Sequence, residues 1–81
     1  MLVEQRVARL DKEIDTVVAD IKAEKGKLEG LRAERRQASP EDRPDYDEEI
    51  QDLKQSIADL KARLQSKEQE RRELTQSLLG R

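Results

Sequence analysis

Carboxylates are the residues of this chain whose grouping could do chemistry. Six of them lie close together around Pro44: Glu41, Asp42, Asp45, Asp47, Glu48 and Glu49. Such a group can bind a divalent cation or a basic partner, but its spacing does not match a calcium-binding loop such as the EF-hand. The first turns of a helix also favour negative charge, because the helix macrodipole is positive there. We therefore predict an acidic tip that is either a helix start or a contact for a partner protein.

The side chains that carry most enzyme chemistry are missing from the sequence. It contains no histidine and no cysteine, which removes the commonest general base, the thiolate nucleophile and the usual zinc ligands. It has no glycine-rich phosphate loop and no dinucleotide fingerprint. Nucleic-acid binding is disfavoured because the net charge is −2 and Tyr46 is the only aromatic residue. The sequence predicts a non-enzymatic protein with no catalytic residue, metal or cofactor.

Charge dominates the composition, with 44% charged and 33% hydrophobic residues among 81. Abundant charge with few apolar residues is typical of disordered segments, but a low net charge and regularly placed apolar residues favour a coiled coil. The first residues carry Glu4 and Asp11 and lack a continuous apolar run, unlike a secretory signal or a membrane span. Together with the lack of cysteine, this predicts a soluble cytoplasmic protein.

Apolar residues recur at alternating steps of four and three in both halves of the chain, which is the pattern of a coiled-coil seam. The first series is Val3, Val7, Leu10, Ile14, Val17, Ile21, Leu28 and Leu31, with Glu24 on the seam between Ile21 and Leu28. The second series is Tyr46, Ile50, Leu53, Ile57, Leu60, Leu64, Leu74 and Leu78, with Lys67 and Arg71 on the seam between Leu64 and Leu74. Pro40 and Pro44 separate them, since proline fits a helix only in its first turn. The predicted organisation is one domain over 1–81, with helices at 2–37 and 44–79 and a turn at 38–44.

The two seams are related to each other through the turn. In an antiparallel hairpin, facing residues have position numbers that add to a constant. A constant of 81 brings the seam of one helix opposite the seam of the other along the whole length, for example Val17 opposite Leu64. Helices of equal length joined by a short connection favour antiparallel neighbours. We therefore predict an all-α fold, an antiparallel two-helix coiled-coil hairpin.

This register leaves a mismatch in the first helix, because Leu10 faces Arg71 and Ile14 faces Lys67. Long basic side chains can lay their methylenes over apolar neighbours, but the first helix is most apolar here, and we expect that the second helix cannot cover it alone. A hairpin of this size is also marginally stable. We predict a homodimer that packs two hairpins as a four-helix bundle. Its predicted interface is Val7, Leu10, Ile14, Val17, Val18 and Ile21.

Small residues follow the outward face of the first helix at steps of four and three: Ala19, Ala23, Gly26, Gly30 and Ala33. Small side chains let another helix approach closely, so this stripe predicts a groove for a partner helix. The high helix propensity of alanine explains much of it equally well. Two function classes therefore stay open. One is a self-associating structural or scaffolding module. The other is a small adaptor or inhibitor that binds an unidentified target protein through the acidic tip or the small-residue stripe.

Overall fold

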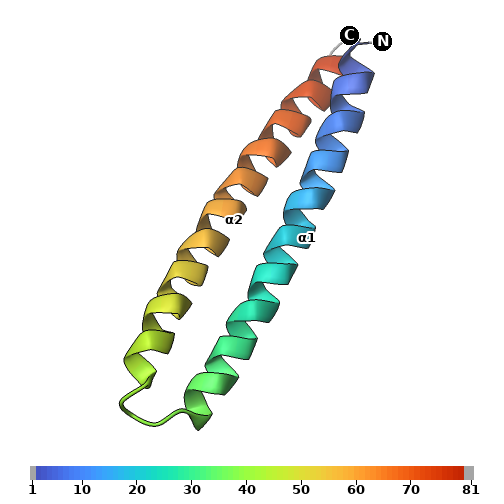
Figure 1. Ribbon diagram of the computed structural model, residues 1–81. Coiled ribbons are helices and arrows are strands. Elements are labelled where there is room, and N and C mark those ends of the chain that lie inside the picture. Colours follow the sequence, from blue (N-terminus) through green and yellow to red (C-terminus); the bar gives the residue numbers. More distant parts are fainter. Residues whose placement is uncertain (1, 80–81) are drawn as a thin grey trace.

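Two packed α-helices form the hairpin. The computed structural model describes residues 2–79, in which α1 spans Leu2–Gln37 and α2 spans Arg43–Leu79. The start of α1 and the end of α2 lie at one end of the molecule, and the turn lies at the other (Figure 1). The Cα trace measures 63 × 14 × 13 Å. The predicted all-α pair of packed helices is confirmed, and it forms a thin rod.

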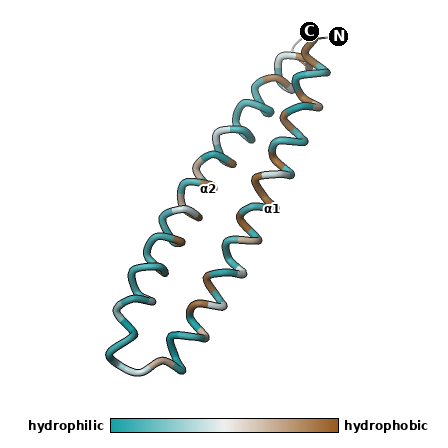
Figure 2. The backbone as a smooth tube through the Cα atoms, viewed as in Figure 1, coloured by the Kyte–Doolittle hydropathy of each residue, from teal (hydrophilic) through white to brown (hydrophobic). Residues whose placement is uncertain are grey.

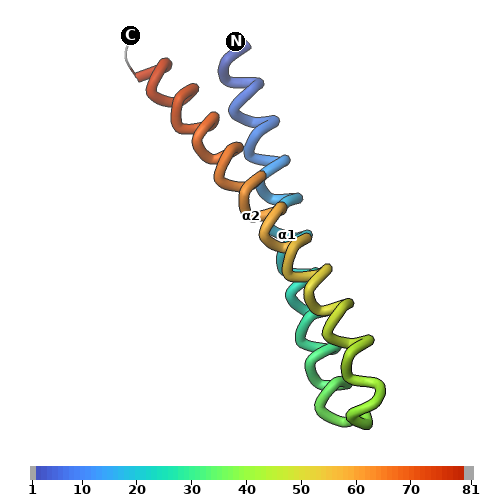
Figure 3. Tube along the Cα trace, turned by 90° about the vertical axis from the view of Figure 1, so that its left-hand side faces the viewer, coloured from blue at the N-terminus to red at the C-terminus, as the bar shows by residue number. Residues whose placement is uncertain are grey.

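The core of the rod is a single line of seam residues between the helices. Figure 3 shows α2 crossing over α1, so that the helices wind around each other. The hydrophobic positions lie mainly on the sides that the helices turn toward each other (Figure 2). The buried residues are Leu10, Val17, Ile21, Leu28, Ile50 and Ile57. All six belong to the two predicted heptad series, as expected when seam side chains pack between two helices.

Ion pairs between the helices reveal their register. Such pairs between described residues include Lys67–Glu13, Arg71–Asp11 and Arg35–Asp47. In each pair the sum of the two position numbers differs by only one from the predicted constant of 81. The loop-proximal core agrees with this register, because Leu53, which should face Leu28, packs against the cluster that contains Leu28. The helices are therefore aligned as the two apolar series require.

The turn is held by backbone hydrogen bonds around Ser39. Its carbonyl accepts from the N–H groups of Asp42 at 3.0 Å and Arg43 at 3.2 Å. Its hydroxyl donates to the Asp42 carboxylate at 3.1 Å. The carbonyl of Asp42 accepts from the N–H of Asp45 at 3.2 Å, which places Asp42 at the N-cap of α2. Pro44 falls in the first turn of α2, where its missing N–H has no partner to lose.

Candidate interaction surfaces

The predicted self-association interface is divided by the fold into a buried part and an exposed part. The buried residues are Leu10, Val17 and Ile21. Val7 and Ile14 are half-buried, and Val18 is 47% exposed. The expectation that α2 cannot cover this part of α1 is therefore wrong for the three buried residues. They belong to the core of the single hairpin and are not available to a second one.

Two basic residues of α2 lie opposite the part of α1 where the sequence showed a mismatch. Lys67 Nζ donates to Glu13 Oε2 at 2.9 Å, and the Lys67 side chain is only 25% exposed. Arg71 Nε donates to the carboxylate of Asp11 in the same way. The register places Arg71 opposite Leu10 and Lys67 opposite Ile14, and both charged heads are held by acidic residues of α1. In this arrangement the aliphatic stems of the two side chains run alongside the seam. Positions 67 and 71 thus act as amphipathic seam residues, and the mismatch seen in the sequence is closed within one chain.

Val18 is the residue of the predicted interface that the hairpin leaves on its surface. It follows Val17, which is 4% exposed, by one position, and a helix turns about 100° per residue. Its neighbours three and four positions away on the helix surface include Ile14, which is half-buried, and the exposed Asp15 and Lys22. A lone exposed valine is common on soluble proteins. The significance of Val18 therefore depends on the charges that surround it.

The small-residue stripe is an open surface of α1. All five of its members, Ala19, Ala23, Gly26, Gly30 and Ala33, are exposed. A Cβ atom added at Gly26 or Gly30 would meet nothing within 4 Å. No close packing inside the described hairpin therefore requires glycine at these positions, and whether the stripe receives a partner helix stays a prediction.

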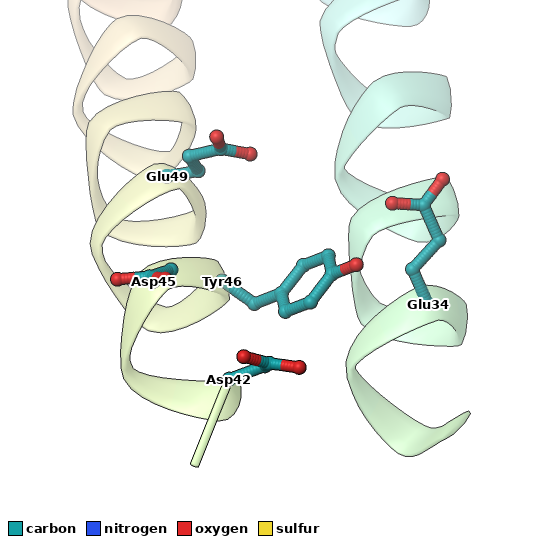
Figure 4. A pocket seen from close by; sticks show the side chains of 5 residues that line it. All are labelled: Glu34, Asp42, Asp45, Tyr46 and Glu49. Carbon is teal, nitrogen blue, oxygen red and sulfur yellow. The ribbon is translucent and has the colours of Figure 1, made fainter. Parts of the chain in front are cut away.

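The acidic tip forms a shallow recess around Tyr46. The recess is lined by Glu34, Asp42, Asp45, Tyr46 and Glu49. Figure 4 shows the Tyr46 ring reaching from α2 toward α1, with carboxylates of both helices around it. This arrangement places an aromatic face beside four acidic side chains, which suits a cationic group.

The predicted tip residues do not all belong to this recess. Asp42, Asp45 and Glu49 line it, whereas Asp47 accepts from Arg35 Nε at 2.5 Å and Nη2 at 3.4 Å. The exposed Glu41 and Glu48 lie outside its lining. Sequence reasoning missed Glu34, which is far from the others in sequence. The hairpin register could have found it, since that register places position 34 at the level of Tyr46 and Asp47 at the tip.

Searches for other kinds of site and for relatives found nothing that assigns a function. Within residues 2–79, no three or more acidic, histidine or cysteine side chains are grouped so as to hold a metal ion. Neither described helix has the length and apolar character needed to cross a membrane. Comparisons of the chain with protein-family models, with curated proteins and with solved structures each gave no match. The surfaces of the rod are thus the basis for a functional proposal.

Proposed function

We propose that this chain is a non-enzymatic protein–protein interaction module that associates with itself, two hairpins packing side by side as a four-helix bundle. The observation that carries the proposal is the exposure of Val18 beside the half-buried Ile14, at the edge of the seam. Burial of apolar surface between two hairpins would favour assembly. The part of the predicted interface that remains accessible is therefore small and centred on Val18.

The thinness of the core supports assembly. Of the side chains in residues 2–79, none falls below 2% exposure, and Tyr46 and most leucines of α2 are only half-buried. A chain of this length buries a modest share of its surface and commonly gains stability from an assembly partner. A second hairpin would cover residues that a two-helix contact leaves partly open.

The shape of the molecule supports a binding role over catalysis. Enzyme sites enclose their substrates and exclude water. The recesses along this rod lie on the surface of two helices, and the one at the tip contains only carboxylates and a phenol as polar groups. A cytoplasmic location is part of the proposal and rests on the cysteine-free composition.

Solution mass tests the proposal directly. Sedimentation equilibrium from micromolar to millimolar chain should show the mass rising from the 9.4 kDa of one chain to twice that value. The thermal unfolding midpoint, followed by circular dichroism, should rise over the same range, because assembly stabilises the folded state by mass action. A mass that stays at one chain, with a constant midpoint, would contradict self-association.

The acidic recess supports a second candidate function, an adaptor that binds a basic segment of a target protein. Glu34 of α1 and Glu49 of α2 line the recess on either side of Tyr46. Four carboxylates around one recess repel each other, so a cationic partner there would relieve repulsion as well as add contacts. This candidate uses the C-terminal end of α1, whereas Val18 lies near the middle of that helix, and it does not require self-association.

A further inference from the structure

The charges on one face of α1 reverse sign about Val18. Residues seven positions apart lie on the same side of a coiled-coil helix. Through Val18, this series is Glu4, Asp11, Val18, Lys25 and Arg32. It is acidic before Val18 and basic after it. Asp15 lies three positions before Val18 and Lys22 four positions after it, next to this series on the outer side of α1. They too are acidic before Val18 and basic after it. We call Asp11, Asp15, Val18, Lys22 and Lys25 the Val18 face.

This order is unfavourable within a single helix. Asp11 and Asp15 are four positions apart, and Lys22 and Lys25 are three apart, so each pair places like charges next to each other. Within the described part of the chain, Asp15, Lys22 and Lys25 form no ion pair or side-chain hydrogen bond. Only Asp11 is engaged, by Arg71. The segregation of charge is therefore not explained by contacts inside the hairpin.

The adjoining surface of α2 adds charged side chains on both sides of Val18. On the basic side of Val18, a recess is lined by Lys25, Leu28, Lys54, Ile57, Ala58 and Lys61. On the acidic side, a second recess is lined by Asp11, Ile14, Glu68, Arg71 and Arg72. Lys54 and Glu68 are each seven positions from Lys61, which the register places beside Val18. The first recess combines three lysines with apolar side chains. The second combines the carboxylates of Asp11 and Glu68 with the guanidinium groups of Arg71 and Arg72, and Arg71 is paired with Asp11.

We propose that the Val18 face binds a second copy of this chain in an antiparallel, two-fold symmetric dimer whose axis passes beside Val18. In that arrangement Val18 meets Val18 of the second copy, Asp15 meets its Lys22, and Asp11 meets its Lys25. Lys54 meets Glu68 of the second copy across the α2 surfaces. A two-fold axis makes every such contact occur twice, once in each direction. Lys61 is the exception, since the axis brings it opposite its own copy. The other charges favour the antiparallel orientation, because a parallel pairing would oppose Asp11 to Glu68 and Lys25 to Lys54.

This inference rests on the proposed self-association and adds its surface, orientation and symmetry. Two variants with opposite charge reversals, measured separately and mixed, test the surface, the orientation and the symmetry together. The variants are Asp15→Lys and Lys22→Asp, with Asp52→Lys on the exposed outer side of α2 as a control of the same chemistry. Each test variant alone should raise the dimer dissociation constant by about tenfold or more, because its like charges oppose each other twice. An equimolar mixture of the two should form a heterodimer with nearly the parent constant, because both contacts are again between opposite charges.

A single introduced cysteine tests the position of the axis. The natural sequence has no cysteine, so Val18→Cys would carry one thiol. Two residues on the axis lie close enough for a disulfide, whose Cα atoms must be within about 7 Å. Val18→Cys should therefore form a disulfide-linked dimer under mild oxidation. Lys25→Cys should not, since its two copies would be separated by about 20 Å along the rods.

The outcomes separate the interface from the proposed function. Two results would overturn the Val18 face and leave self-association intact. In the first, the parent is dimeric but Asp15→Lys and Lys22→Asp dimerise as well as Asp52→Lys does. In the second, the parent is dimeric but Lys25→Cys cross-links as efficiently as Val18→Cys. A parent that stays monomeric at every concentration would overturn both. Circular dichroism of each variant, compared with the parent, excludes loss of the hairpin as the cause of a lower mass.

Discussion

Val17 and Val18 are chemically identical neighbours that the fold uses in opposite ways. Val17 lies on the seam and is 4% exposed, whereas Val18 lies beside the seam and is 47% exposed. The difference arises because one step along a helix rotates the side chain by about 100°, enough to leave the contact with α2. The same hydrophobic side chain thus stabilises the hairpin at one position and remains on the surface at the next.

The two valines predict different effects of the same substitution. Val17→Ala removes two carbons from the core and should lower the free energy of unfolding by about 2 kcal/mol, from lost burial and an incompletely closed cavity. Val18→Ala, measured where the parent is monomeric, should change it by less than about 0.5 kcal/mol. Urea unfolding followed by helical circular dichroism measures both. Equal losses for the two variants would show that Val18 is also part of the core in solution.

At the scale of the helices, α1 continues without interruption through Gly26 and Gly30. Glycine in a helix interior is about 1 kcal/mol less favourable than alanine, because it loses more backbone freedom on folding. An added Cβ would meet no atom within 4 Å at either position. Packing within the hairpin therefore does not compensate for the unfavourable propensity of these two residues.

Replacing these glycines should stabilise the hairpin. Gly26→Ala and Gly30→Ala should each raise the free energy of unfolding by about 1 kcal/mol, which corresponds to a rise of about 5 °C in Tm for a chain of this size. Thermal unfolding by circular dichroism measures the change. Ala23→Gly, on the same exposed stripe, should produce a loss of similar size. A fall in stability for either alanine variant would show that the stripe is packed against another surface in solution.

The heptad pattern was sufficient to predict the helices and their alignment, because both depend on the regular spacing of apolar residues. Coverage of Leu10 could not be predicted from spacing, since the residue opposite it is Arg71, whose charged head is held by Asp11. The composition of the tip recess was only partly predictable for a related reason. Asp42 and Asp45 are close in sequence, but Glu34 joins them through the hairpin. The errors thus lie in side-chain direction and not in the path of the backbone.

The whole molecule is a rod long enough to keep its two candidate surfaces independent. Val18 and Glu34 are separated by sixteen residues of continuous α1, or about 24 Å at the rise of an α-helix. Electrostatic effects between exposed charges are largely screened beyond about 8 Å at physiological ionic strength. The charge at the tip should therefore have little influence on assembly through the Val18 face, and each surface can be tested without disturbing the other.

Glu34→Lys separates the two candidate functions at this scale. Glu34 lies in the last turn of α1, where the macrodipole favours a cation, so the substitution should raise the free energy of unfolding by roughly 0.3–1 kcal/mol. The mass of the assembly should stay unchanged, while binding of a lysine-rich peptide at the tip should weaken several-fold relative to the parent and to Glu29→Lys. Since Tyr46 is the only aromatic residue, tyrosine fluorescence reports peptide binding in the recess alone. If tyrosine fluorescence does not change as the peptide is added to the parent or to either variant, the recess is excluded as a site for basic segments. A drop in assembly mass for Glu34→Lys would place the self-association surface at the tip instead of at Val18.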